Sequence, residues 1–191
     1  MAEVLAVCIG QPRAVSAFDA RGREHTVVTG IYKEPVTGRV HARYWGLEGD
    51  GQADTRVIKG RQVHGGAEKA IYLYPFEHYA PWQSELGKEL VHGQFGENLT
   101  ITGLLEETTR VGDTLRVGEA LVQVTSPRGP CYKFDIRMGI PECKELMNAN
   151  GRTGFYVRVL EPGSIGAGDR IEVVSTDPSA MTILELHRAS L

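Results

Sequence analysis

Cys131 is the side chain with the clearest chemical potential, because of the residues beside it. It lies in the segment Ser126-Pro-Arg-Gly-Pro-Cys-Tyr-Lys133, between Arg128 and Lys133. A thiol held beside two cations tends to ionise, and the thiolate is the form that attacks electrophiles or binds metals. The prolines fix φ near one value, and Gly129 can take the positive φ of a tight turn. We expect Cys131 in a rigid loop after a strand, where functional residues are common; a buried thiol in a structural turn is the alternative.

A second loop, His64-Gly-Gly-Ala-Glu-Lys69, could bind an anion. Adjacent Gly65 and Gly66 allow backbone N–H groups to point together at an anion, or to approach a flat ligand closely. His64 can donate, accept or titrate near neutral pH. Taken alone, a hairpin turn with an incidental histidine explains the segment better.

A third loop, Phe95-Gly-Glu-Asn98, leads into an apolar segment. The Asn98 amide offers the donors and acceptors that recognition of a heterocycle edge or a phosphate requires. The alternative is a strand entry at which Asn98 bonds its own backbone.

Other segments point to structure rather than chemistry. Gly46-Leu-Glu-Gly-Asp-Gly51 has neither the Rossmann nor the P-loop spacing, so we expect a turn with Glu48 and Asp50 in solvent. Cys8 lies in an apolar stretch and is expected to be buried. The sequence has no C-x-x-C pair and no G-x-S-x-G, which argues against a zinc site and a serine hydrolase. A cysteine hydrolase that pairs Cys131 with His64 stays open.

These loops connect short apolar segments that predict a mainly β fold. Ten strands are expected, at 4–9, 14–18, 25–28, 40–45, 69–74, 99–101, 114–117, 121–125, 154–159 and 170–174. Three helices are expected, at 75–86, 141–149 and 180–190. In the second, Ile140, Cys143, Leu146 and Met147 should share one apolar face. Many short strands and few helices favour a closed or nearly closed β-barrel with short peripheral helices.

Composition excludes several classes of protein. The 191 residues carry a net charge of −3, which gives no general attraction to nucleic acid or to an anionic membrane surface. No apolar run approaches the ~20 residues of a membrane helix. Three cysteines without paired spacing favour a reducing compartment, and we expect a cytoplasmic protein.

Five motifs, taken in order, resemble one family. They are Gly46-Leu-Glu-Gly-Asp, Val63-His-Gly-Gly, Ala70-Ile-Tyr-Leu-Tyr, Phe95-Gly-Glu-Asn-Leu and Pro127-Arg-Gly-Pro-Cys131. The set is similar to the MOSC domain, the C-terminal domain of molybdenum cofactor sulfurases, and most of all to YiiM-type bacterial proteins linked to hydroxylaminopurine resistance. The resemblance implies a MOSC β-barrel over residues 1–176. It leaves residues 177–191 as a C-terminal helical tail where such proteins have a small helical domain, which is here truncated or missing.

The resemblance also implies a cofactor and a reaction. The cofactor would be molybdopterin, and the reaction would be the reduction of N-hydroxylated bases. A separate reductase would supply the electrons. Family-level pyridoxal phosphate binding is implied as well. Oligomeric state is left open. Cys131 would bind molybdenum and His64 would relay a proton. Pterin or phosphate contacts are implied for Asn98, Arg128, Gly65, Gly66, Lys69, Glu97 and Lys133.

Two other functions stay open. As a sulfur carrier, the protein would hold a persulfide on Cys131 and pass the sulfur to a metal centre. As a non-catalytic module, it would bind a phosphorylated heterocycle, and loss of the Cys131 thiol would leave that binding intact. Soft sulfur ligands suit a redox metal, which is why the reductase is the first choice.

Overall fold

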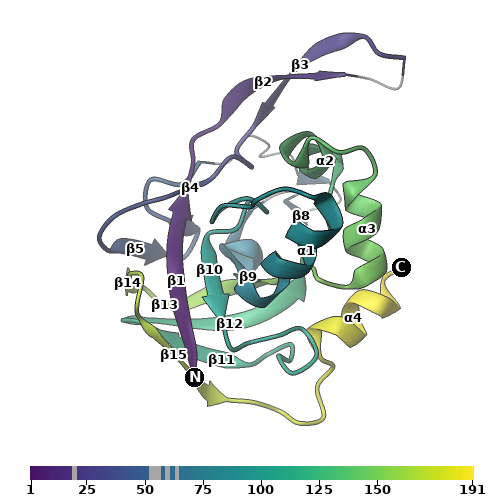
Figure 1. Cartoon of the computed structure of the whole chain (residues 1–191). Helices are drawn as coiled ribbons and strands as arrows, with labels where there is room; N and C mark the ends of the chain where they lie inside the picture. The colour runs from purple at the N-terminus through teal and green to yellow at the C-terminus, as the bar shows by residue number, and fades with distance from the viewer. Residues whose placement is uncertain (19–20, 52–56, 59–60, 63–64) are drawn as a thin grey trace.

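A closed barrel of seven strands forms the centre of the computed structural model, which describes residues 1–18, 21–51, 57–58, 61–62 and 65–191 (Figure 1). The barrel strands are β1 (Ala2–Ile9), β9 (Ile71–Pro75), β10 (Leu99–Thr102), β11 (Thr114–Val117), β12 (Ala120–Pro127), β13 (Phe155–Glu161) and β15 (Arg170–Ser175). They follow the order β10-β9-β13-β12-β11-β15-β1, and antiparallel pairing of β1 with β10 closes the ring. Only β9 and β10 pair in parallel among these strands. The predicted mainly β barrel is confirmed.

Shorter strands and helices surround the barrel. The additional strands are β2 (Arg13–Phe18), β3 (Glu24–Thr29), β4 (Glu34–Pro35), β5 (Val40–Arg43), β6 (Gly46–Leu47), β7 (Val57–Ile58), β8 (Arg61–Gln62) and β14 (Gly163–Ile165). The helices are α1 (Tyr79–Leu86), α2 (Tyr132–Met138), α3 (Cys143–Asn150) and α4 (Ile183–Ala189), with 3₁₀ turns η1 (Ala67–Lys69) and η2 (Phe76–His78). The β2–β3 hairpin projects from the body beyond α2, at the top of Figure 1.

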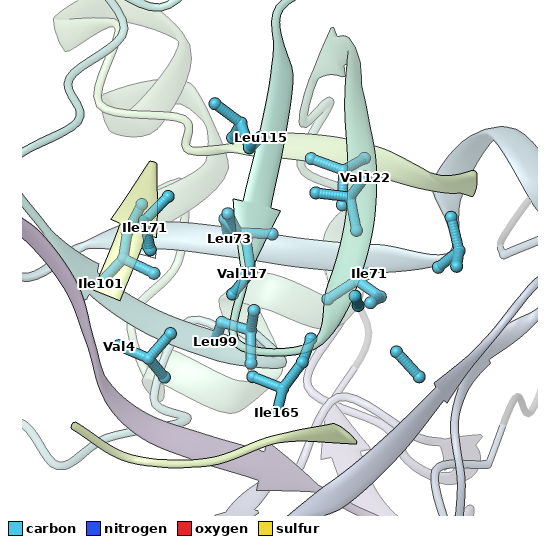
Figure 2. Close-up of a cluster of buried hydrophobic side chains, with 14 of the residues drawn as sticks. Val4, Ile71, Leu73, Leu99, Ile101, Leu115, Val117, Val122, Ile165 and Ile171 are labelled. Carbon is cyan, nitrogen blue, oxygen red and sulfur yellow. The ribbon is translucent and has the colours of Figure 1, made fainter. Parts of the chain in front are cut away.

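Strand β9 shows how the sequence builds two cores. All five of its residues are buried, because both of its faces are covered. Ile71 and Leu73 point into the barrel and join the aliphatic cluster of Figure 2. Tyr72 and Tyr74 alternate to the outer side, as the two-residue period of a strand requires. The outer face of β9 is therefore a wall against which other elements pack.

Helices α1, α2 and α3 supply the second core. Their buried side chains pack with Tyr72 and Tyr74 in an aromatic cluster, and Phe95 stacks on Tyr74 with ring centroids 4.0 Å apart. Trp82 is fully buried and donates from its indole Nε1 to the Tyr74 hydroxyl over 2.8 Å. This cluster fixes α2, and with α2 the position of Cys131 just before it.

The helices differ from the prediction in three ways. Helix α2 was not predicted, and Cys131 occupies its N-cap instead of a loop. The segment 75–86 begins with the 3₁₀ turn η2, and the α-helix starts only at Tyr79. In α3, Cys143 and Met147 are buried as predicted, and Ile140, just before the helix, packs on the same cluster, but Leu146 is 45% exposed. The predicted shared face was therefore wrong in part.

The C-terminal segment packs on the barrel. Helix α4 begins with a capping box between Thr182 and Glu185, and its Ile183 and His187 side chains are buried. The boundary placed at residue 176 stays a prediction. None of the helices in the described part of the chain has the length and apolar character of a membrane span.

Candidate functional site

A cavity of about 100 Å³ lies on the outer side of the barrel wall rather than inside the barrel. Its floor includes Tyr72 and Tyr156, which are paired across β9 and β13 with ring centroids 5.2 Å apart. Four segments complete the walls: the loop after β3, residues 65–69 before β9, the loop before β10, and the segment that leads from β12 into α2. The lining residues are Thr29, Gly30, Ile31, Lys33, Gly65, Lys69, Tyr72, Gly96, Asn98, Arg128, Gly129, Cys131, Lys133 and Tyr156. Six of the residues assigned to the site from sequence thus meet in one place: Gly65, Lys69, Asn98, Arg128, Cys131 and Lys133.

Arg128 is a buried cation at this cavity. Its guanidinium carbon lies 5.0 Å from the ring centroid of Tyr72 and 4.9 Å from that of Phe134. Burial opposes the charged form, but the neighbouring Tyr72, Tyr156 and Cys131 raise the pKa of Arg128 on balance. None of the described residues gives Arg128 a carboxylate partner. A buried cation held by aromatic rings is well suited to an anionic ligand, which would compensate its charge.

Cys131 is the accessible thiol of the chain. It is half-buried and lines the cavity, whereas Cys8 and Cys143 are fully buried, as predicted for both. Desolvation raises the pKa of Cys8 to about 12 and that of Cys143 to about 11, so both stay protonated at neutral pH. None of the three forms a disulfide. Among the thiols, only Cys131 is placed to reach a ligand in the cavity.

Lys69 and Lys133 add positive charge to the cavity. Lys69 Nζ lies 5.7 Å from the ring centroid of Tyr156. Lys133 Nζ donates to the carbonyl oxygen of Val28 over 3.2 Å and so ties α2 to β3. Within the described part of the chain neither lysine has an acidic partner, and no Asp or Glu lines the cavity. The site is thus positive although the whole chain carries −3.

Asn98 is held firmly by the protein. Its Oδ1 accepts from the backbone N–H of Tyr72 over 3.1 Å, and its Nδ2 donates to Asp50 over 2.9 Å and to the Cys8 carbonyl over 3.4 Å. Neither sequence interpretation anticipated these partners. The expectation that Asp50 is solvated was wrong: its side chain is 6% exposed and paired with that of Lys33. Burial of a carboxylate requires such partners, and they come from segments distant in sequence.

Glu97 is placed inside the fold and does not line the cavity. Its carboxylate accepts from the backbone N–H groups of Gly93 and Phe95 and from the hydroxyls of Tyr79 and Thr100. These bonds order the loop that leads to Asn98. Gly66 also lies outside this cavity, in the neighbouring depression beside Thr125 and Leu186.

His64 lies outside the described residues, so its relation to the cavity stays a prediction. Gly65 and Gly66 both have positive φ, 67° and 86°. Sequence reasoning missed the segment from Thr29 to Lys33 and the two tyrosines of the floor. The available signal for the segment was Lys33, which lies between Tyr32 and Glu34-Pro35. For the two tyrosines, the signal was the alternation of side chains along β9. The described residues contain no cluster of three His, Cys, Asp or Glu side chains that could hold a metal ion.

Residues 60–172 match the model of the MOSC domain, which covers more than half of the chain. The chain belongs to the MOSC domain family. The chain is similar to three proteins: uncharacterized protein YflK of Bacillus subtilis (39% identity, 97% of this chain and 79% of the relative), protein YiiM of Escherichia coli (40%, 76% and 63%) and a reductase of Gibberella moniliformis (31%, 85% and 28%). The chain therefore spans less than two thirds of the second and third relatives.

A solved crystal structure shares the fold. The crystal structure of YiiM from Geobacillus stearothermophilus matches all of this chain and 84% of its own, with a TM-score of 0.78 and 29% identity. The MOSC family is associated with molybdenum cofactor binding. The residues of the cavity fit such a group. The accessible sulfur of Cys131 suits a soft metal, and Arg128, Lys69 and Lys133, which have no acidic partner among the described residues, suit a phosphate.

Proposed function

We propose that this protein binds the molybdenum cofactor in the cavity and reduces N-hydroxylated bases or related N-oxygenated compounds. The observation that carries the proposal is the cavity wall itself. There an accessible thiol, Cys131, lies beside three cations, Arg128, Lys69 and Lys133, and no acid comes from the described lining residues. Membership of the MOSC family and similarity to a protein named as a reductase support the same function.

The residues would divide the work as follows. Cys131 would give its sulfur to the metal, and Arg128 would bind the phosphate, because a guanidinium forms paired bonds with phosphate oxygens. Lys69 and Lys133 would hold the remaining negative charge. Tyr72 and Tyr156 line the cavity and would contact the bound group. When bound, the cofactor supplies two-electron redox chemistry.

The overall reaction must balance. Reduction of an N-hydroxylated base breaks the N–O bond, consumes two electrons and two protons, and gives the amine and water. The electrons come from a separate reductase, since the sequence shows no flavin or iron–sulfur motif. Protons would be relayed by His64 in the role that the resemblance gives it.

The test is the metal content of the protein made in a host that synthesises molybdopterin. We expect about one molybdenum per chain in the wild type and a loss of tenfold or more in Cys131→Ser, as for a residue that binds the metal directly. Cys143→Ala is the matched control, because Cys143 is a buried thiol outside the cavity. Its molybdenum content should equal that of the wild type.

The same preparations separate the rival functions. A persulfide on Cys131 without bound molybdenum would replace the proposal with a sulfur carrier. Retention of molybdenum and of reductase activity in Cys131→Ser would show that the thiol is not the ligand. If the protein binds the ligand but reduces no N-hydroxylated base, it is a non-catalytic binding module.

A further inference from the structure

A buried ion pair lies at the cavity, and the proposed function gives it no role. Lys33 lines the cavity, and its ammonium binds both carboxylate oxygens of Asp50. The side chains are 7% and 6% exposed. Lysine is rarely buried this deeply without a partner, and a pair of this kind contributes little net stability compared with apolar residues. Its position at the cavity points to a use other than stability.

The backbone fixes the place of Lys33. A Cβ on Gly10 would lie 2.3 Å from the carbonyl oxygen of Tyr32, and a Cβ on Gly93 would lie 2.4 Å from that of Lys33. Both distances are shorter than any real contact of this kind, so only glycine permits the loop to lie so close. Two separate segments therefore make room for the Lys33 backbone.

Asp50 holds more than Lys33. Its Oδ1 accepts from the backbone N–H of Gly10 over 3.0 Å, and its Oδ2 accepts from Nδ2 of Asn98 over 2.9 Å. Asp50 does not itself line the cavity. The pair thus presents its positive end to the ligand and keeps its negative end in the protein.

Asn98 and Lys33 differ in whether they have an N–H bond left to donate to a ligand. Both N–H bonds of the Asn98 amide are used, toward Asp50 and toward the carbonyl of Cys8. An ammonium has three N–H bonds, and two directed at the two oxygens of Asp50 leave a third. Lys33 can therefore donate to a ligand without losing its protein partner, whereas Asn98 cannot.

We propose that Lys33 contacts the anionic, phosphate-bearing part of the ligand and that Asp50 is the positioning residue for both Lys33 and Asn98. The inference deepens the proposed function and rests on it for the identity of the ligand. Lys33 takes the direct contact that the family motif suggested for Asn98, and Asn98 links β1, β9 and Asp50 as part of the wall.

The test is calorimetric titration of the full chain with inorganic phosphate at pH 7. Lys33→Gln keeps a donor for Asp50 but removes the charge, and we expect it to weaken phosphate binding by about tenfold or more, the worth of one charged hydrogen bond. Lys33→Arg should stay within about threefold of the wild type, because it restores the charge. Arg188→Gln, an exposed charge outside the cavity, should leave the affinity unchanged.

Salt dependence separates contact from mere structural support. Removal of a ligand-facing charge lowers the steepness with which affinity falls with added salt, so Lys33→Gln should flatten that dependence. Asp50→Asn keeps the ammonium, and should lower affinity while the salt dependence stays as in the wild type. Thermal melting of each variant sets a titration temperature at which all are folded.

Several outcomes would overturn the inference: wild-type affinity in folded Lys33→Gln, a salt dependence that Lys33→Gln leaves unchanged, or no phosphate binding by the wild type. The proposed function fails separately. If the wild type binds molybdenum through Cys131 but its phosphate binding does not depend on Lys33, the proposed function stands and the inference about Lys33 is wrong. If phosphate binding depends on Lys33 but the protein binds no molybdenum, the inference stands and the proposed function is wrong.

Discussion

Glu97→Gln should destabilise the protein strongly, because the Glu97 carboxylate is fully buried and serves four donors. Its Oε1 accepts from the Gly93 N–H over 2.8 Å, from the Thr100 hydroxyl over 2.9 Å and from the Tyr79 hydroxyl, and its Oε2 accepts from the Phe95 N–H over 3.0 Å. An amide replaces one of these acceptors with a donor.

The magnitude follows from the bonds. With the amide oxygen in place of Oε1, three charged hydrogen bonds become neutral, and each loses about 1 kcal/mol. The amide N–H₂ then faces the N–H of Phe95, and one unsatisfied buried donor costs about 1–3 kcal/mol. Relief from burying a charge offsets part of this loss. We expect a net decrease in the free energy of unfolding of about 2–4 kcal/mol.

Urea unfolding at pH 7 measures the effect, and the m value should stay constant if the transition remains two-state. Glu107→Gln is the matched control, since Glu107 is exposed, and it should change the free energy by less than about 0.5 kcal/mol. Tyr79→Phe completes a double-mutant cycle, in which we expect coupling of about 1–2 kcal/mol with Glu97→Gln. A decrease below about 1 kcal/mol, or no coupling, would refute the assignment of Glu97 to the interior network.

Two further predictions concern the thiols and one strained backbone position. At pH 7 an alkylating reagent should label Cys131 first in the native protein, because Cys8 and Cys143 are buried and desolvation raises their pKa values to about 12 and about 11. Mass spectrometry identifies the labelled site, and all three cysteines should be labelled in denaturant. Equal labelling rates of the three cysteines in the native protein would contradict the prediction. Glu142 has φ 63°, the only positive φ among described residues other than glycine, so Glu142→Gly should raise the free energy of unfolding by about 0.5–1 kcal/mol. Glu142→Ala keeps the unfavourable φ and should give no such gain, and an equal gain in both variants would assign the effect to the lost carboxylate.

Local sequence was sufficient for the barrel and for the buried cysteines. Alternation of apolar residues predicts strands wherever one face of a segment is buried, and it placed most barrel strands within a few residues of the observed bounds. Cys8 and Cys143 lie among apolar neighbours, so their burial followed from the same pattern.

Helix α2 shows that proline and glycine residues are not sufficient to place the end of a loop in this sequence. Pro127 and Pro130 with Gly129 predict a continuing loop, whereas a helix begins at Tyr132. Phe134 and Met138 carry the signal that was there, since they are four residues apart and both are buried. A short helix of this kind is stabilised mainly by its packing on the aromatic cluster rather than by propensity.

The sequence by itself determined that a cysteine lies between two cations in a rigid segment, and that the chain folds as a β-rich MOSC domain. Only the tertiary structure decided that Lys33, Asp50 and Asn98 share one network at the cavity. These residues are far apart in the chain, and no local pattern reports which distant side chain neutralises a buried charge. Burial creates the need for a partner, and the closing of the barrel decides which partner is within reach.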